Sequence, residues 1–147
     1  MNSPSDLRRL VKDLLSRQKF CVLATQGQGQ PYGSLLAFAE TEDLKQLLFA
    51  TNRDTRKFSN LISEPRVALV IDSRSNSEAD ISSAVAITAL GPAREAGGSD
   101  RERLASVYLG KHPGLAQFVG SPDVAVCAVA VEDYVIARFR EVTVLQP

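Results

Sequence analysis

Short apolar runs separated by polar turns dominate the pattern of hydrophobic and polar positions along this chain. Runs of four to ten residues rich in Val, Ile, Leu and Ala are typical of β-strands. We expect strands at residues 20–25, 31–39, 47–50, 67–71, 81–90, 124–131 and 134–145. The glycine-containing turn at residues 26–30 predicts that the first two strands form a hairpin.

Helical spacing of apolar residues predicts an amphipathic helix before the first strand. Ser3 or Ser5 opens this helix, with Asp6 in or near its first turn, where a carboxylate is favourable. Its apolar face consists of Leu7, Leu10, Val11, Leu14 and Leu15.

A second helix is predicted at residues 55–63. Asp54 is its expected N-cap, because a carboxylate there can accept from free N–H groups of the first turn. The expected buried face consists of Phe58, Leu61 and Ile62. The pair Glu64-Pro65 ends this helix, since a residue before proline avoids the α conformation.

A third helix is predicted at residues 101–109, after a glycine-rich turn at 95–100. Ser99 or Asp100 is its expected cap, and Gly110 is its expected end. Its apolar face consists of Leu104, Val107 and Tyr108, and a short apolar segment follows at residues 115–119.

This order of elements predicts the fold class. The strands come mostly in consecutive runs, which favours an antiparallel sheet over a doubly wound parallel one. We therefore expect a mainly β protein, a closed or split antiparallel β-barrel with peripheral helices. With 147 residues, of which 44% are apolar, the chain is most simply a single domain spanning residues 1–147.

Polar residues gather where the strand at 47–50 meets the helix at 55–63. A helix N-terminus offers unpaired N–H donors and a partial positive charge. Two hydroxyls, an amide and two cations are added there, from Thr51, Asn52, Thr55, Arg56 and Lys57. The pattern suits a phosphate group; the alternative is a solvated basic first turn on a surface helix.

The same stretch, ATNRDTRKFSNLISEPRVALVI, resembles the core motif of the pyridoxamine 5'-phosphate oxidase-like, FMN-binding split-barrel family. That motif has a Thr-Asn turn, a Ser/Thr-Arg-Lys triplet, an Asn-Leu-containing helix and a Pro-Arg-Val strand. The resemblance extends more weakly through FCVLAT, QPYGSLLAFA, LGKHPGLAQFV and the strand at residues 134–144, which together cover most of the chain.

The resemblance implies an FMN-binding split barrel that pairs as a homodimer, with the cofactor sites at the subunit interface. Thr51, Arg56 and Lys57 match the positions that hold the FMN phosphate and ribityl chain. The strand at residues 31–36 would line the isoalloxazine ring. On this strand the implied flavin contacts are Tyr32, Ser34, Leu35 and Leu36.

Departures from the family pattern narrow the function. Basic residues at the two ends of the 31–38 strand, a glutamine near Ala86 and a C-terminal Arg-x-His motif are missing, so pyridoxal phosphate synthesis is not expected. One of the missing basic residues is expected to contact the FMN phosphate, and Arg53 is a candidate replacement for it. We expect an FMN-dependent oxidoreductase whose small-molecule substrate is unknown. Residues 73–80 and 109–119 are expected to select that substrate.

Two alternatives remain open. The first is a non-catalytic carrier or binding protein for flavin, deazaflavin or haem. The second is a structural or regulatory split barrel that has lost its cofactor. The sequence offers no residue with a clear acid–base or nucleophilic role, so catalysis would depend on cofactor positioning.

Charge and composition bear on partners and location. Seventeen Lys plus Arg residues balance seventeen Asp plus Glu residues, so nothing attracts the chain to nucleic acid or an anionic membrane. No run approaches the ~20 apolar residues of a membrane span. The N-terminal residues 1–20 carry dispersed charges rather than a signal peptide's apolar region, so a cytoplasmic location is expected.

The remaining candidate chemistry is sparse. Cys21 and Cys127 lie in apolar strands and are expected to be buried, reduced thiols. Two cysteines with a single histidine do not make a standard zinc site, so no metal is expected. His112 is expected to be a turn residue. Arg138 and Arg140 fall on one apolar strand face, where they would meet carboxylates, solvent, a second subunit or a ligand.

Overall fold

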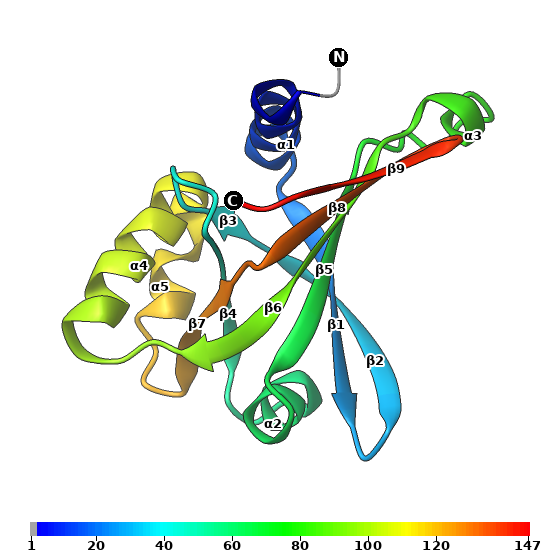
Figure 1. Ribbon diagram of the computed structural model, residues 1–147. Coiled ribbons are helices and arrows are strands. Elements are labelled where there is room, and N and C mark those ends of the chain that lie inside the picture. The colour runs from blue at the N-terminus through cyan, green and yellow to red at the C-terminus, as the bar shows by residue number, and fades with distance from the viewer. Residues whose placement is uncertain (1–2) are drawn as a thin grey trace.

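The computed structural model describes residues 3–147 as an antiparallel sheet curled into a barrel with helices around it (Figure 1). The strands are β1 Phe20–Gly27, β2 Gln30–Ala37, β3 Ala39–Glu40, β4 Gln46–Asn52, β5 Arg66–Asp72, β6 Ala86–Glu95, β7 Val124–Ala130, β8 Asp133–Arg138 and β9 Glu141–Leu145. The helices are α1 Pro4–Arg17, α2 Arg56–Ser63, α3 Asp80–Ser83, α4 Gly98–Lys111 and α5 Ala116–Val119, with a 3₁₀ turn at Pro113–Leu115. The expected mainly β, antiparallel fold is confirmed.

The sheet closes into a barrel because the chain bends between β2 and β3, which lie at the two ends of the strand order. The strand order is β2-β1-β5-β6-β7-β4-β3, with β8 paired to β6 and β9 to β8. Since β2 and β3 are separated by Phe38 alone, the bend there joins the first strand of this order to the last. No ladder joins β2 to β4 within residues 3–147, so the barrel is split between them. The expected single strand at 31–39 is therefore two strands.

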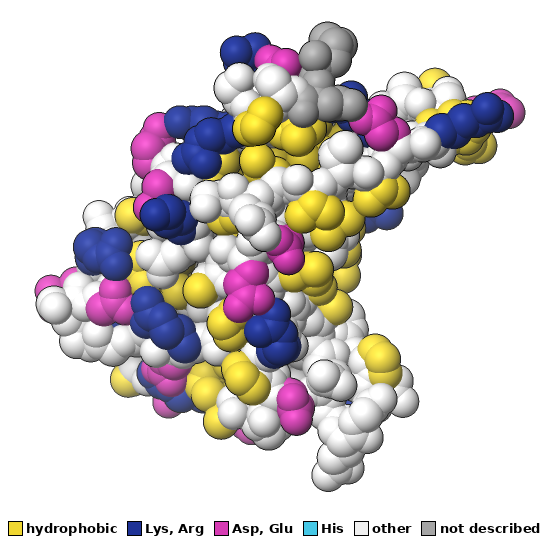
Figure 2. Space-filling view, in the orientation of Figure 1, with side chains coloured by type: hydrophobic (Ala, Val, Ile, Leu, Met, Phe, Trp, Pro, Cys, Tyr) yellow, Lys and Arg dark blue, Asp and Glu magenta, His cyan; other side chains and the backbone are white. Residues whose placement is uncertain are grey.

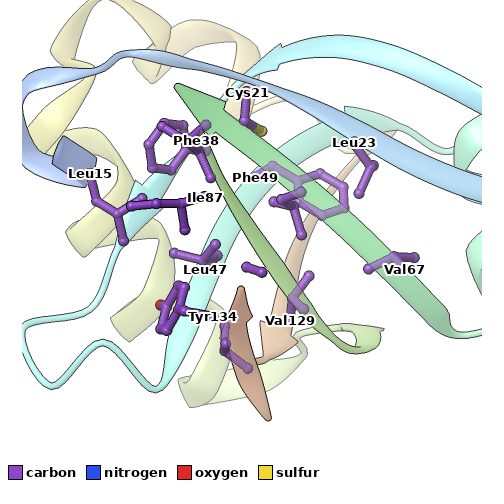
Figure 3. Packing of buried hydrophobic residues seen from close by; sticks show 14 of the residues in the cluster. Leu15, Cys21, Leu23, Phe38, Leu47, Phe49, Val67, Ile87, Val129 and Tyr134 are labelled. Atoms are coloured by element: carbon purple, nitrogen blue, oxygen red, sulfur yellow. The ribbon is translucent and has the colours of Figure 1, made fainter. Parts of the chain in front are cut away.

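Helices close the ends of the barrel, and Figure 1 shows α1 and α2 at opposite ends. Leu7, Val11 and Leu15 of α1 join the barrel core, as expected from their spacing, and Ser3 caps that helix. Phe58 and Leu61 of α2 enter the same core from the other end. Figure 3 shows how residues of many strands, including Leu23, Phe49, Ile87 and Tyr134, meet in this core.

The face of the barrel formed by β3, β4 and β7 is covered by α4 and α5 (Figure 1). Leu104 and Tyr108 of α4 pack there against Leu48 and Val126 in a second apolar cluster. The outer faces of β1, β5, β6 and β8 carry no helix among the described residues. Within residues 3–147, no helix is long and apolar enough to cross a membrane.

The structure corrects the limits of α4. Gly97, rather than Ser99 or Asp100, is its N-cap. The Asp100 carboxylate instead accepts from Arg94 at 2.7 Å and Arg103 at 2.8 Å, so it is not free to cap the backbone. The helix also continues past Gly110, and Val107, expected inside, is 37% exposed.

The expected strand at residues 81–90 begins later, at Ala86. The Asp80 carboxylate accepts from the Ser75 and Ser77 backbone N–H groups at 2.7 and 3.2 Å, which folds the loop around it. The short helix α3 follows, and Ile81 is 71% exposed instead of lying in a sheet. Asp80 thus converts the start of an apolar run into a local turn.

The expected long strand at residues 134–145 is a hairpin of β8 and β9. Arg138 pairs in register with Glu141, and Arg140 lies in the turn. The prediction that Arg138 and Arg140 share a face with Ile136, Val142 and Val144 therefore holds only for Arg138 and Ile136. The turn reverses the chain, so these valines lie on the face opposite Arg138.

Candidate functional site

A compact hydrogen-bonded turn joins β4 to α2. The Thr55 hydroxyl donates to the Asn52 carbonyl at 2.9 Å and lies 3.3 Å from the hydroxyl of the buried Thr51. The Asn52 side chain accepts from the Asp54 N–H at 2.8 Å. These bonds fix the direction in which α2 starts.

Thr55 is the N-cap of α2, so the prediction of Asp54 is wrong by one residue. The Thr55 hydroxyl accepts from the Phe58 N–H at 3.4 Å. The side chain of Asn52 holds the backbone of Asp54, which places Asp54 before the cap and leaves its carboxylate exposed. Within residues 3–147, the N–H groups of Arg56 and Lys57 have no acceptor.

The first turn of α2 carries two cations and no acidic residue. Neither Arg56 nor Lys57 forms an ion pair with any described residue. Cations at a helix N-terminus are unfavourable unless an anion compensates them. Within residues 3–147, no ion pair therefore compensates the positive charge of these two side chains.

Arg56 links this turn to β2 across the split in the barrel. Its guanidinium carbon lies 4.5 Å from the centre of the Tyr32 ring, a cation–π contact. Ser34, two residues further along β2, lies on the same face of the strand as Tyr32. Thus Tyr32 and Arg56, predicted from separate parts of the sequence, meet in the structure.

The other two predicted β2 residues lie on opposite faces of the strand. Leu36 shares the face of Tyr32 and Ser34, points into the barrel and is 9% exposed, whereas Leu35 points outward and is 73% exposed. The alternation of a strand therefore separates Leu35 from the other three residues. Leu35 instead belongs to the outer face of the sheet.

A buried polar contact fixes α2 against β1. The Asn60 side chain donates from Nδ2 to the Thr25 hydroxyl at 3.0 Å, and both residues are buried. A Cβ on Gly27 would come within 2.3 Å of Asn60 Oδ1, so glycine allows this approach. Asn60 takes the buried position that we expected for Ile62, which is 60% exposed.

Arg53 is committed to a different contact. Its guanidinium meets Glu95 at 2.5 Å and donates to the Pro122 carbonyl at 2.7 Å. These bonds tie the turn to the end of β6 and to the loop before β7. Arg53 is therefore not a free cation that could replace a missing phosphate ligand.

The histidine and the two cysteines are not placed for acid–base or thiol chemistry. His112 Nε2 lies 2.6 Å from the Phe38 carbonyl, so this histidine holds the bend between β2 and β3. Cys21 and Cys127 are buried and free, as expected. Burial raises the pKa of each thiol to about 12, so neither is a thiolate near neutral pH.

A feature that the sequence pattern did not reveal is an apolar row on the outer face of the sheet. From β2 to β9, strand by strand, the register aligns Leu35, Val22, Val70, Thr88, Val135 and Val144, all of them apolar except Thr88. Val144 is 56% exposed, and Phe20 and Val142 nearby are 60% and 66% exposed. Figure 2 shows hydrophobic side chains along the ridge of β8 and β9. Only cross-strand register could have shown that these residues form one surface.

The split barrel and its helix-start turn define a class of protein. A family model described as pyridoxamine 5'-phosphate oxidase matches residues 7–136. The chain belongs to this family, as the resemblance implied. A search of curated proteins found no match.

Solved structures share the fold at low sequence identity. The heme binding protein from Mycobacterium smegmatis has a TM-score of 0.84 and 15% identity, over 99% of this chain and 59% of that one. General Stress Protein 26 from Bacillus anthracis has a TM-score of 0.73 and 15% identity, over 96% and 98%. A putative 5-nitroimidazole antibiotic resistance protein from Bacteroides thetaiotaomicron has a TM-score of 0.70 and 11% identity, over 86% and 81%. These likenesses support the split-barrel fold, and the chain spans about three fifths of the heme binding protein.

Proposed function

We propose that this protein binds FMN at the β4–α2 turn and acts as a flavin-dependent oxidoreductase on a small molecule. The observation that carries the proposal is that Arg56 and Lys57 have no ion pair, and the first N–H groups of their helix no acceptor, among the residues that the structure describes. A phosphate would satisfy both the cations and the N–H groups. Membership of the pyridoxamine 5'-phosphate oxidase family favours a flavin as the carrier of that phosphate.

The protein's part in this function is to bind and orient. Arg56, Lys57 and the first N–H groups of α2 hold the phosphate, while Thr51 and Thr55 shape the turn. Tyr32 and Ser34 border the split through which the ring would lie along β2. The flavin, when bound, supplies the transfer of hydride or single electrons.

We also propose that a second copy of the chain covers the apolar outer row and completes the cofactor site. A row of this kind, running across six strands, is larger than scattered surface apolar residues. The formal net charge of zero leaves little repulsion between copies. Leu35, on the same strand as Tyr32, places the row next to the proposed site.

The pairing is testable with Val144→Glu, which puts a carboxylate at the β9 end of the proposed interface. We expect the unmodified protein to have twice the 15.9 kDa mass of one chain by light scattering, and the variant to have that of one chain. The matched control is Val107→Glu on α4, outside the row, which should remain a dimer. A single-chain mass for the unmodified protein would refute the pairing.

Retention of the cofactor is tested by the visible absorbance spectrum of the purified protein after saturation with FMN and gel filtration. A flavin spectrum that elutes with the protein supports the site and directs attention to electron donors, beginning with reduced nicotinamide. Turnover with an electron acceptor separates an enzyme from a carrier. No retained flavin would leave a split barrel without a reason to call it an oxidoreductase.

Haem is the second candidate ligand, favoured by the likeness to the heme binding protein from Mycobacterium smegmatis. A haem protein needs an axial ligand, and Nε2 of the chain's single histidine is hydrogen-bonded to the Phe38 carbonyl. This engagement makes haem the less favoured ligand. A Soret band after incubation with haemin, absent in His112→Ala, would reverse that order.

A further inference from the structure

Two contacts join α2 to the hairpin of β1 and β2, and together they involve four residues. Arg56 and Asn60 stand one turn apart on α2, so their side chains leave the same side of the helix. Thr25 and Tyr32 lie directly opposite each other across the hairpin. Arg56 lies over the ring of Tyr32, and Asn60 donates to the hydroxyl of Thr25. One turn of the helix is therefore attached at two points to one pair of facing residues in the hairpin.

The hydroxyl of Thr25 connects the two contacts. It accepts from Asn60 Nδ2 at 3.0 Å and donates to the Tyr32 carbonyl, whose oxygen lies 3.5 Å away. Thr25 and Asn60 are only 3% and 7% exposed. An amide buried without a partner is costly, so α2 is held in an orientation in which Asn60 reaches Thr25.

This hydrogen bond sets the rotation of α2 about its own axis. Asn60 is buried, whereas Ile62, about 200° further round the helix, is 60% exposed. Apolar burial alone would favour the reverse, with Ile62 inside and Asn60 in water. Gly27 leaves the space that Asn60 Oδ1 occupies, since a Cβ there would come within 2.3 Å of it. The inward amide therefore indicates a demand on the direction of α2 beyond the burial of apolar surface.

We propose that Thr25 and Asn60 are positioning residues, which fix the rotation of α2 and thereby hold the Arg56 guanidinium beside β2. Arg56 lies about 40° round the helix from Asn60, so a rotation that withdraws Asn60 from Thr25 also carries Arg56 away from Tyr32. The consequence for FMN rests on the proposed function, whereas the placement of Arg56 does not.

The consequence for FMN follows from the two elements that would hold it. The phosphate would be bound at the start of α2, and the ring would lie along β2. Both ends of the cofactor can be held at once only if the helix and the strand keep a fixed relation, and preorganisation of this kind strengthens binding. The pair of Thr25 and Asn60 supplies that relation from inside the barrel, without contact with the ligand.

The first measurement is proton NMR of the cofactor-free protein. Protons above an aromatic ring resonate at lower frequency, so the Arg56 side chain should show a ring shift relative to Tyr32→Leu, which lacks the ring. Thr25→Val keeps the shape of the side chain and removes its hydroxyl. We expect this variant to lose the ring shift of Arg56 and to melt roughly 5 °C lower, because the Asn60 amide loses its partner.

Thr25→Ser retains the hydroxyl and should keep the ring shift. Asn60→Ser, whose hydroxyl can bond within its own helix, should lose the ring shift as Thr25→Val does, and it replaces that variant if Thr25→Val does not fold. A purely structural pair would lower the melting temperature and leave the folded protein unaltered. An undiminished ring shift of Arg56 in Thr25→Val, or in Asn60→Ser where that variant replaces it, would therefore overturn the proposal.

The second measurement compares FMN with riboflavin, which lacks the phosphate, by fluorescence titration. Thr25→Val should bind FMN about tenfold more weakly, the effect of one lost charge-assisted hydrogen bond, and should bind riboflavin unchanged. Thr25→Ser should restore the affinity for FMN. Ser59→Ala, at an exposed position of α2, is the control and should alter neither affinity.

Equal losses for FMN and riboflavin, or an unchanged affinity for FMN in Thr25→Val, would overturn the link between this pair and the phosphate. Failure of the proposed function gives a different result. In that case the unmodified protein would bind neither flavin, or would bind both equally. The ring shift of Arg56 would still decide whether Thr25 and Asn60 orient the helix.

Discussion

Replacing both Arg56 and Lys57 by glutamine is expected to weaken FMN binding by about 100-fold. The two cations stand at the start of α2 without an ion pair among the described residues. Each would form a charge-assisted hydrogen bond to the phosphate, and glutamine cannot supply the charge. Fluorescence titration of the flavin measures the loss.

Riboflavin supplies the sharpest control, because it has the same ring and ribityl chain without the phosphate. The double variant should bind riboflavin as well as the unmodified protein does. A second control, Arg9→Gln with Lys45→Gln, removes the same charge from exposed positions on α1 and in the loop before β4. Equal losses for FMN and riboflavin would show that Arg56 and Lys57 shape the ring site instead of holding a phosphate.

The thermal stability of the cofactor-free protein distinguishes a ligand site from a structural contact. Neutralising two cations at a helix N-terminus should stabilise the fold by up to about 1 kcal/mol. Losing the Arg56–Tyr32 contact should cost about 0.5 kcal/mol. We therefore expect almost no change in melting temperature, and a large fall would assign these residues to the fold.

The candidate site was predictable where its residues are close in sequence. The order of polar residues from Thr51 to Lys57 predicts a helix start with cations, and the structure places them there. The cap was missed by one residue because Asn52 and Thr55 compete with Asp54 for the backbone groups of the turn. Such competition depends on loop geometry, which residue types alone do not determine.

Features built from distant segments were not predictable. The outer row needs the register of six strands, and the contact of His112 Nε2 with the Phe38 carbonyl needs the end of α4 to reach the bend between β2 and β3. The hairpin of β8 and β9 was missed because Phe139 and Arg140 lack the usual turn residues and sit between apolar runs. In each case tertiary pairing decided an outcome that local propensity left open.

The largest stability loss is expected from Gly91→Ala, about 3 kcal/mol. A Gly-Pro pair such as Gly91-Pro92 is typical of a break or bend in a strand, yet β6 continues through it. The strand changes partner there, from β8 at Leu90 to β7 at Ala93. The chain leaving β7 passes so close that a Cβ on Gly91 would lie 1.9 Å from the Ala130 carbonyl oxygen.

The space is occupied by backbone and not by a flexible side chain. The clash of the added Cβ can therefore be removed only if β6 and the chain leaving β7 move apart. Thermal unfolding should show a melting temperature lower by roughly 10 °C. Gly33→Ala in β2 is the matched control, since its Cβ would meet only Val22 Cγ1, at an ordinary 3.7 Å, and should change stability little. If Gly91→Ala had the melting temperature of the unmodified protein, β6 and the chain leaving β7 would approach each other less closely than this, and the change of partner in β6 would not depend on the absence of a side chain at Gly91.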